Sequence, residues 1–361
     1  MKNSMSIQEA TKSYERWMRQ RTTVVESDLR SKHEQMKRDP LLFLRGTFYR
    51  WAQQFPEICL ELARAPRVLA GGDVHVGSYG TWRDEEGRLC WGIDDFDEAY
   101  PLPYTNDLVR LATSVKIAID QGELSVKLRD GCGAIIEGYR EALRQGGCPM
   151  VLAERERNLE KLGIAAIKPA DDFWEKLNDR PVVSAGFPPN ARLAMAKTLP
   201  HARLKYKVVR RVAGMGSLGQ QRFVAIANWK GGFICREAKA MVPSACVWLR
   251  SQGRRTPSYY QEIIESAVRS RDPYQKIVGP WLIRRLSPDS NPIDISDLPK
   301  EREEETLLYA MGSEVANIHL GSRPRIKTLL ENLNRRKENW LREAAKIMAR
   351  TVEKDWKHYR R

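Results

Sequence analysis

The sequence predicts an α+β protein in which helical regions flank a β-rich region. Apolar residues recur at helical spacing in several segments: residues 6–37, 41–55, 105–165, 301–320 and 325–350. Strand-like runs separated by Gly-containing turns lie between them, at residues 205–214, 220–229, 232–239 and 280–287. A chain of 361 residues is long enough to bury the core of one large domain or of two lobes.

The first elements alternate between polar and apolar patterns. Residues 6–37 predict a polar, charged helix or a pair of helices, and Asp39–Pro40 marks its end. Residues 66–72 and 88–93 predict short strands, so residues 73–87 are expected to form a loop and turn between them.

Later segments complete the division of the chain. Residues 168–200 resemble a linker with short helices, and residues 258–269 predict a further helix. We therefore expect the following parts: an N-terminal helical extension (1–39), a helical lobe (40–200), a β-rich lobe (201–290), and helices that return to the helical lobe (291–361).

Composition excludes several classes of protein. The six cysteines are scattered and include no C-x-x-C pair, which argues against a zinc site and a disulfide framework and favours reduced thiols. The N-terminus lacks the apolar core of a secretory signal, and no apolar run approaches the ~20 residues that span a bilayer. A cytoplasmic location is the expectation.

The net charge of +15 indicates that an anionic partner is possible. Residues 323–361 hold thirteen Lys and Arg against five Asp and Glu. This surface could attract nucleic acid, an anionic lipid surface or a phosphorylated substrate, or it could be the solvated face of an amphipathic helix. No zinc finger or RNA-binding signature indicates a dedicated nucleic-acid module.

Carboxylates gather unexpectedly in this basic chain. GGDVHVGSYG (71–80) is followed by WGIDDFDEAY (91–100), which places Asp94, Asp95, Asp97 and Glu98 within five residues. Such groups repel one another unless a cation, a proton or basic neighbours compensate. The pattern therefore predicts a metal-dependent site, with two acidic turns held by caps and arginines as the alternative. A two-metal phosphoesterase also begins with G-D-x-H, but the later His201, His319 and His358 lack the setting it needs.

GMGSLG (214–219) is a G-x-G-x-x-G segment with strand-like sequence on both sides. This context is typical of the Gly-rich loop that covers ATP phosphates in protein kinases rather than of a dinucleotide-binding turn, which leads into a helix. Gly214, Gly216, Ser217 and Gly219 are the candidate phosphate-binding residues, and a plain hairpin turn is the alternative.

The strand that follows, FICREAKA, offers a cation for the same phosphates. Kinase-type sites carry such a cation on the strand after the Gly-rich hairpin, and a helix carboxylate positions it. Arg236 and Lys239 are the candidate cations, and Glu262 or Glu265 the candidate partners.

The two acidic segments fit the remaining parts of a phosphotransferase. Asp73 would orient the attacking hydroxyl and accept its proton, and Ser78 lies where a metal-binding Asn is usual. Asp95, followed by Phe96, would be the main Mg²⁺ ligand, with Ser78, Asp94 or Asp97 helping. The two pieces are similar to GDxHxxN and the hydrophobic-D-F-D-D-A segment of aminoglycoside-phosphotransferase-like kinases.

The combined set of motifs resembles an uncharacterised bacterial family, the domain of unknown function 2252. The resemblance covers roughly residues 40–322 and rests on six segments: FLRG (43–46), GDVHVGSYG (72–80), DDFDEA (94–99), DLVRLATS (107–114), GMGSLG (214–219) with REA (236–238), and GSEVANIHLGS (312–322). Ser78 stands where the family has Asn, and Arg236 stands where it has Lys.

The order of the motifs implies a rearranged fold. Kinases place the Gly-rich loop before the catalytic loop, whereas here it follows about 140 residues later. The resemblance thus implies a protein-kinase-like two-lobed fold that is circularly permuted. One nucleotide must reach both parts, so we expect residues 214–219 to lie within about 15 Å of Asp73 and Asp95. Asp107 is expected to cap its helix, and Arg110 and Arg45 to pair with the acidic loop.

The function expected from these residues is that of an ATP- and Mg²⁺-dependent phosphotransferase. Its acceptor is unknown, and a small molecule is the expectation. The alternatives are a pseudokinase that binds ATP without turnover, a nucleotidyl transferase that holds ATP reversed, and a basic module that binds nucleic acid or protein.

Overall fold

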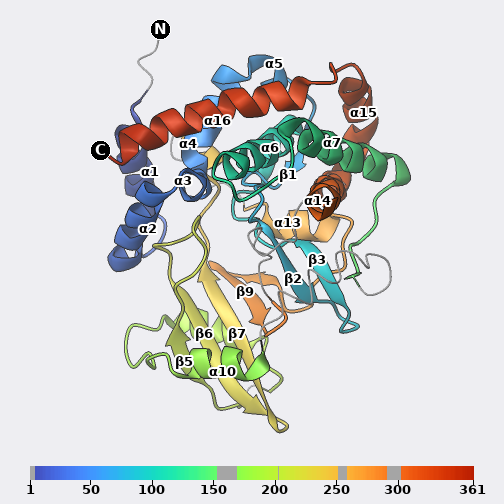
Figure 1. Cartoon of the computed structure of the whole chain (residues 1–361). Coiled ribbons are helices and arrows are strands. Elements are labelled where there is room, and N and C mark those ends of the chain that lie inside the picture. Colours follow the sequence, from blue (N-terminus) through green and yellow to red (C-terminus); the bar gives the residue numbers. More distant parts are fainter. Residues whose placement is uncertain (1–4, 153–168, 202, 251–257, 291–301) are drawn as a thin grey trace.

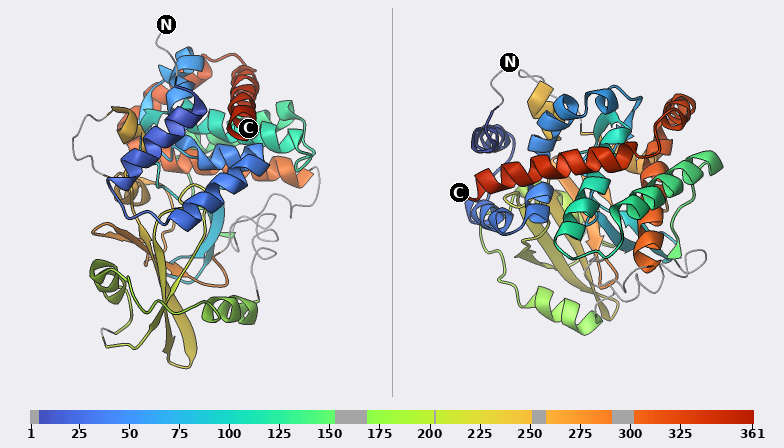
Figure 2. Two further views of the ribbon diagram at one scale, coloured as in Figure 1. Left: turned by 90° about the vertical axis from the view of Figure 1, so that its left-hand side faces the viewer. Right: turned by 45° about the horizontal axis from the view of Figure 1, so that its top comes forward.

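The computed structural model describes residues 5–152, 169–201, 203–250, 258–290 and 302–361. These residues form a large helical lobe and a smaller lobe built on an antiparallel sheet (Figures 1 and 2). The expected α+β class is confirmed. Within the described residues, no helix is long and apolar enough to cross a membrane.

Short helices open the chain and join the helical lobe: α1 (Ile7–Arg19), α2 (Glu26–Arg38), α3 (Pro40–Gly46), α4 (Phe48–Ile58) and α5 (Leu60–Ala63). Ser6 and Glu9 form a capping box at the start of α1. The Asp39 side chain accepts a hydrogen bond from the Leu42 amide, with Pro40 at the first position of α3. The predicted pair of helices in residues 6–37 is thus confirmed.

Two small antiparallel pairs follow: β1 (Arg67–Ala70) with β4 (Tyr100–Pro103), and β2 (Tyr79–Arg83) with β3 (Leu89–Ile93). The expectation that residues 73–87 are all loop and turn is wrong, because β2 lies within them. Glycine and serine obscure the strand pattern there, but Tyr79 stacks on Trp91 across the pair with ring centroids 5.0 Å apart.

Longer helices and the segments between them complete the helical lobe: α6 (Thr105–Asp120), α7 (Leu128–Gln145), α14 (Arg302–His319), the 3₁₀ helix η2 (Leu320–Arg325), α15 (Ile326–Asn334) and α16 (Trp340–Tyr359). Helix α16 runs across the outside of this lobe (Figure 1). Helices α7 and α14 pack so closely that a Cβ on Gly138 would lie 2.0 Å from the Tyr309 carbonyl oxygen.

The smaller lobe contains the following elements: α10 (Ala170–Asn178), α11 (Pro189–Ala196), β5 (Lys207–Arg210), β6 (Arg222–Trp229), β7 (Gly232–Ala240), β8 (Lys276–Val278) and β9 (Trp281–Leu286). The strands form one antiparallel sheet in the order β5-β6-β7-β9-β8. Helix α11 packs on one face of this sheet and α10 on the other (Figure 1). The boundary suggested at residue 200 therefore falls after two helices that pack with the sheet.

Helices α12 (Ala245–Arg250) and α13 (Tyr260–Ser266) lie between β7 and β8 in the chain but belong elsewhere in space. Their apolar residues, among them Cys246 and Ile263, are buried in the core of the helical lobe. Helices α12 and α13 therefore connect the sheet to the core of the helical lobe. Five of the six cysteines are buried.

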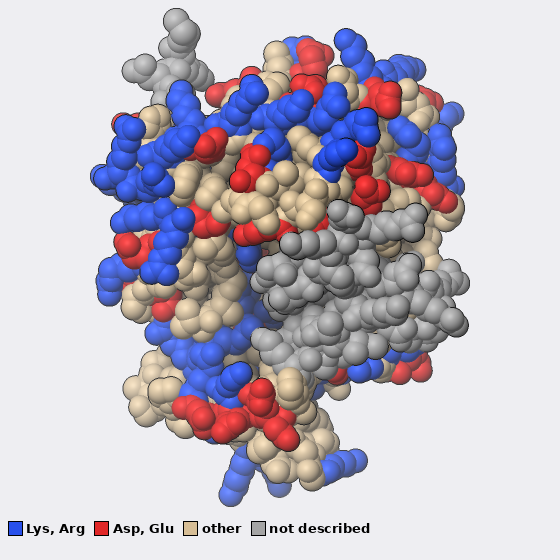
Figure 3. Space-filling view, in the orientation of Figure 1, with Lys and Arg blue, Asp and Glu red and all other residues tan. Residues whose placement is uncertain are grey.

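Basic side chains gather over α16 and the N-terminal helices, with acidic ones among them (Figure 3). Part of the charge is paired on α16 itself: Lys346 lies 3.1 Å from Glu343, and Lys357 lies 2.7 Å from Glu353. Exposed pairs of this kind contribute little stability. The anionic partner suggested for residues 323–361 remains a prediction.

Candidate active site

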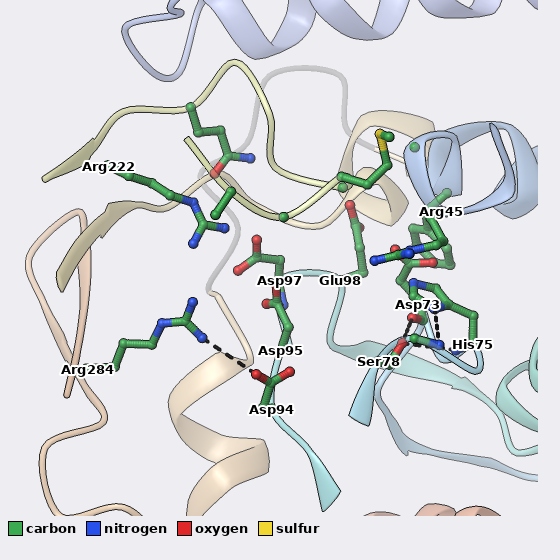
Figure 4. Close-up of a pocket in the computed structure, with 18 of the residues that line it drawn as sticks. Arg45, Asp73, His75, Ser78, Asp94, Asp95, Asp97, Glu98, Arg222 and Arg284 are labelled. Carbon is green, nitrogen blue, oxygen red and sulfur yellow. Dashed lines mark hydrogen bonds and ion pairs between the residues drawn. The ribbon is translucent and has the colours of Figure 1, made fainter. Parts of the chain in front are cut away.

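A cavity of about 440 Å³ lies between the two lobes (Figure 4). Its size is in the range of ordinary small-molecule sites. Three segments that are distant in sequence line it: the Asp73 loop (residues 73–78), the acidic loop (residues 94–98) and the Gly-rich segment (residues 214–219). The fold therefore brings together motifs that the sequence separates by about 140 residues.

Asp73 follows β1 and is held by an arginine from α6. The Arg110 Nε donates to Asp73 Oδ1 at 2.6 Å, and a second nitrogen of the same guanidinium donates to the Leu44 carbonyl at 2.8 Å. Burial raises the pKa of Asp73 to about 6, although Arg110 acts to lower it. The expectation that Arg110 pairs with the acidic loop is therefore wrong, because its acidic partner is Asp73.

A buried chain of hydrogen bonds fixes the turn just before Asp73. Asp107 on α6 accepts from the Gly71 and Gly72 amides at 2.8 and 3.0 Å. His319 at the end of α14 bonds Asp107 through Nε2 at 3.1 Å and the Tyr139 hydroxyl through Nδ1 at 2.8 Å. The expectation that Asp107 caps its own helix is wrong, because its carboxylate is bonded to the β1 turn.

Gly72 offers a direct test of how tightly this turn is packed. Its φ is +80°, and a Cβ there would lie 2.3 Å from the Glu98 carbonyl oxygen, whereas Gly87, at φ +75°, has nothing within 4 Å. We expect Gly87→Ala to cost about 1–2 kcal/mol, the left-handed penalty alone. Gly72→Ala should cost a further ~1–3 kcal/mol from the clash. Urea unfolding of both variants measures the difference, and equal losses would contradict this packing.

Ser78 closes the Asp73 loop. Its hydroxyl donates to the Asp73 carbonyl at 3.0 Å and accepts from the His75 amide at 3.0 Å. Burial, with Arg45 and Arg110 nearby, holds the pKa of His75 well below its usual value, so this imidazole is neutral at pH 7. The hydroxyl proton of Ser78 is used in its hydrogen bond to the Asp73 carbonyl, and Ser78 also lines the cavity.

Lys239 on β7 compensates the crowded carboxylates. Its ammonium lies 3.0 and 3.1 Å from the two oxygens of Asp95 and also pairs with Asp97. Burial raises the pKa of Asp95, but Lys239, Arg222 and Arg284 outweigh it, and the net pKa lies below the usual value. Burial and the neighbouring Asp95 raise the pKa of Asp97 to about 6. The acidic loop is therefore stabilised by a buried lysine from the other lobe.

The other acidic residues of this loop also face the cavity. Asp94 lies 3.8 Å from Arg284, and burial raises its pKa. Glu98 accepts from the Ala245 amide at 2.7 Å, which anchors the loop to α12. Burial raises the pKa of Glu98 to about 8, so its carboxyl group is mostly protonated at pH 7.

Arg236 and Glu262 lie apart from this cluster. Arg236 projects from the opposite face of β7, since it is three residues from Lys239 and side chains alternate along a strand. Its Nε donates to the Thr198 carbonyl at 3.1 Å, and its guanidinium stacks on Tyr274 at 3.7 Å. Glu262 and Glu265 are exposed on α13, and within the described residues neither pairs with Arg236 or Lys239.

Sequence reasoning missed the arginines on the sheet side of the cavity. Arg222 and Arg284 both bond the buried carboxylate of Glu237, at 3.3 and 2.6 Å, and Arg211 joins them at 2.7 Å. Arg222 and Arg284 point toward the acidic loop in Figure 4. The strands held a sequence signal for them: charged residues stand at alternate positions in otherwise apolar strands. In the sheet, Arg222 lies opposite Lys239, and Glu237 lies opposite Arg284.

The Gly-rich segment approaches Asp73 directly. Gly214 and Gly216 line the cavity, and a Cβ on Gly216 would lie 3.7 Å from Asp73 Oδ2. Two of the predicted phosphate-binding residues face elsewhere: Ser217 accepts a hydrogen bond from Arg222, and Gly219 packs against Leu29 of α2. The segment and the Asp73 loop are thus in contact, as one shared ligand site requires.

Unpartnered buried atoms show what this cavity could hold. Among the described residues, Arg45 Nε, Arg222 Nε and Asp97 Oδ1 are buried at the cavity without a hydrogen-bond partner. Such atoms are rare unless a ligand completes them. The donors suit phosphate oxygens, and the carboxylate suits a hard cation. No three His, Cys, Asp or Glu side chains of the described residues form a ready metal cluster; Mg²⁺ commonly needs only one or two carboxylates beside substrate phosphates.

Comparison with known proteins gives one match. No curated protein and no solved structure matches the chain. Residues 8–170 match the model of a family described as an uncharacterized protein conserved in bacteria, DUF2252. The match spans the Asp73 loop and the acidic loop and ends before the Gly-rich segment and the sheet, so it supports the resemblance to this uncharacterised family over the first part of the chain.

Proposed function

We propose that the chain is a kinase-like phosphotransferase that uses ATP and Mg²⁺ and transfers the γ-phosphoryl group to an acceptor hydroxyl. The observation that carries the proposal is that the Gly-rich segment, Asp95 and Asp73 line one cavity, with Lys239 buried beside it and bonded to Asp95. The two acidic segments come from one lobe, and the Gly-rich segment and the lysine come from the other.

The order of parts within the sheet supports the same proposal. The Gly-rich segment joins the first two strands, β5 and β6, and Lys239 lies on the third, β7. In protein kinases the Gly-rich loop covers the phosphates and the phosphate-binding lysine also lies on the third strand. This order of elements supports the proposal, and the roles of the residues rest on the site itself.

The residues have separate roles in this reaction. Asp73 accepts the proton of the acceptor hydroxyl while the oxygen of that hydroxyl forms a bond to the γ-phosphorus. The bond between the γ-phosphorus and the β–γ bridging oxygen breaks, and ADP leaves with that electron pair. A pKa of about 6 leaves Asp73 ionised at pH 7. Gly214 and Gly216 admit phosphates close to the backbone, and Arg222 offers its free Nε. Asp95 and Asp97, helped by Asp94 or Ser78, would hold Mg²⁺, which neutralises charge on the phosphates.

Binding of ATP without turnover is the second candidate. It is favoured by Ser78, which occupies the position of a metal-binding Asn and whose hydroxyl is already bonded on both sides. The hydroxyl oxygen of Ser78 is also a weaker Mg²⁺ ligand than the amide oxygen of an Asn at this position, whose side chain is longer. Nucleotidyl transfer remains a variant of the first proposal, because the same groups could hold ATP reversed.

Asp73→Asn tests the proposal. We expect the variant to bind Mg²⁺–ATP as the wild type does but to release phosphate from ATP about 10²–10⁴-fold more slowly, because the proton acceptor is gone. Release with water as acceptor, measured by a coupled phosphate assay, avoids the need to know the acceptor. Wild-type binding without any release would favour the second candidate. Equal rates in the two proteins would contradict the role of Asp73.

A further inference from the structure

Helix α2 and the two residues before it make specific contacts in and around the Gly-rich segment. The Val25 amide donates to the Gly219 carbonyl at 2.7 Å, and Val24 forms a β-bridge with Gln220. Leu29 packs against Gly219, where a φ of +98° disfavours any side chain and a Cβ would lie 3.3 Å from Leu29. Asp28 pairs with Arg210 at the end of β5. These contacts hold α2 and the Gly-rich segment as one body.

Lys32 lies at the centre of this contact and faces the cavity. It is 7% exposed, and its Nζ donates to the Gly216 carbonyl at 2.8 Å. An ammonium has three donors, and this carbonyl takes one. Burying a cation beside a single neutral acceptor is costly unless an anion completes its shell.

The Asp73 loop has no cation of its own, and Arg45 from α3 is the nearest other cation of the cavity with an unpartnered donor. Residues 73–78 contain no Lys or Arg, and His75 is neutral. Arg110 is committed to Asp73 and to the Leu44 carbonyl. Lys32 reaches the place where the Gly-rich segment meets Asp73, which is where the transferred phosphoryl group must sit if Asp73 is the base.

We propose that Lys32 is a phosphate-binding residue of this site, supplied by the N-terminal helices, that bridges the Gly216 carbonyl and the terminal phosphate of the nucleotide. This assignment rests on the proposed function. It adds to the site a residue of α2, which contains none of the sequence motifs discussed above. It also gives α2 a role, which is to carry this cation and to hold the Gly-rich segment over Asp73.

The charged groups around Lys32 add a pH dependence. Glu15 from α1 and Asp73 favour its charged form, Glu98 does so only when it is ionised, and Arg45 from α3 lines the same cavity. Burial nevertheless lowers the pKa of Lys32 to about 8. The ammonium is therefore charged below pH 8 and is lost as the pH rises through that value, so affinity for a phosphate bound there should fall between pH 7 and 9.

Lys32→Met tests the assignment, with Lys37→Met as a matched control on the exposed side of the same helix, where Lys37 pairs with Glu34. The probes are ATP, ADP and inorganic tripolyphosphate, titrated calorimetrically with Mg²⁺, and thermal melts check folding. We expect Lys32→Met to weaken ATP and tripolyphosphate about 10–100-fold and ADP little, because one charge-assisted bond to the terminal phosphate is lost. It should also make the fall in affinity between pH 7 and 9 smaller, leaving the part that the ionisation of Glu98 causes, and Lys37→Met should change nothing.

The other possible results either contradict the role of Lys32 or show whether that role and the proposed function fail independently. Equal weakening of ATP and ADP, or no weakening, would make Lys32 a structural support of the Gly-rich segment and overturn the assignment. If the wild type binds tripolyphosphate but neither nucleotide, the proposed function fails while the Lys32→Met effect on tripolyphosphate still decides the role of Lys32. If it binds none of the three, both proposals fail.

Discussion

Replacing Asp95 with Asn is expected to remove most of the Mg²⁺ dependence of ATP binding. Asp95 is the carboxylate of the acidic loop whose pKa is held below the usual value, so it is ionised throughout the working range. Its partner Lys239 also pairs with Asp97, which should keep the lysine in place in the variant. Loss of a metal ligand should then appear in binding rather than in folding.

The measurement is a titration with a fluorescent ATP analogue at increasing MgCl₂. We expect Mg²⁺ to strengthen binding to the wild type, and Asp95→Asn to lose about 10–100-fold of that gain. Asp94→Asn is the comparison, because Asp94 lies in the same loop but pairs only loosely, at 3.8 Å, with Arg284. A smaller effect at Asp94 would identify Asp95 as the main ligand. The same Mg²⁺ response in wild type and Asp95→Asn would refute that role.

Glu237→Gln is expected to cause the largest loss of stability. Its carboxylate is fully buried on β7 and is bonded by Arg211, Arg222 and Arg284. Burial raises its pKa, but the three guanidinium groups outweigh this, and the net pKa lies well below the usual value. Neutralising it leaves buried arginines without their counter-charge, for which we expect a cost of about 3–5 kcal/mol.

Urea unfolding followed by circular dichroism measures this cost. Glu61→Gln is the matched control, because Glu61 also bonds an arginine, Arg64, but both side chains are largely exposed. That pair should contribute little, so the control should unfold at the wild-type midpoint. Equal midpoints for wild type, Glu61→Gln and Glu237→Gln would mean that the arginine cluster does not support the sheet.

The local parts of the fold could be read from the sequence. Ser6 with Glu9, and Asp39 with Pro40, mark helix starts by rules that involve only neighbouring residues. Strand β2 could not be read, because its stability comes from pairing with β3 and from the stacking of Tyr79 on Trp91. The role of Asp107 was misread for a similar reason: its partners, Gly71 and Gly72, come from another element.

The candidate site divides in the same way. Short motifs pointed to Asp73, Asp95, Gly216 and Lys239; the first three line one cavity, and Lys239 bonds Asp95 beside it. The strand period could have decided between Lys239 and Arg236 only if the face of β7 toward the cavity had been known. Lys32 carries no motif, since a lysine on a polar helix is ordinarily a solvated residue. Only the docking of α2 on Gly219 reveals it.

The central claim is that these segments form one site for a nucleotide and its metal ion. Calorimetric titration of the wild-type protein with ATP, with and without Mg²⁺, tests it most directly. The account predicts saturable binding with Mg²⁺ and clearly weaker binding when Mg²⁺ is replaced by a chelator. Absence of binding at millimolar ATP under both conditions would contradict it.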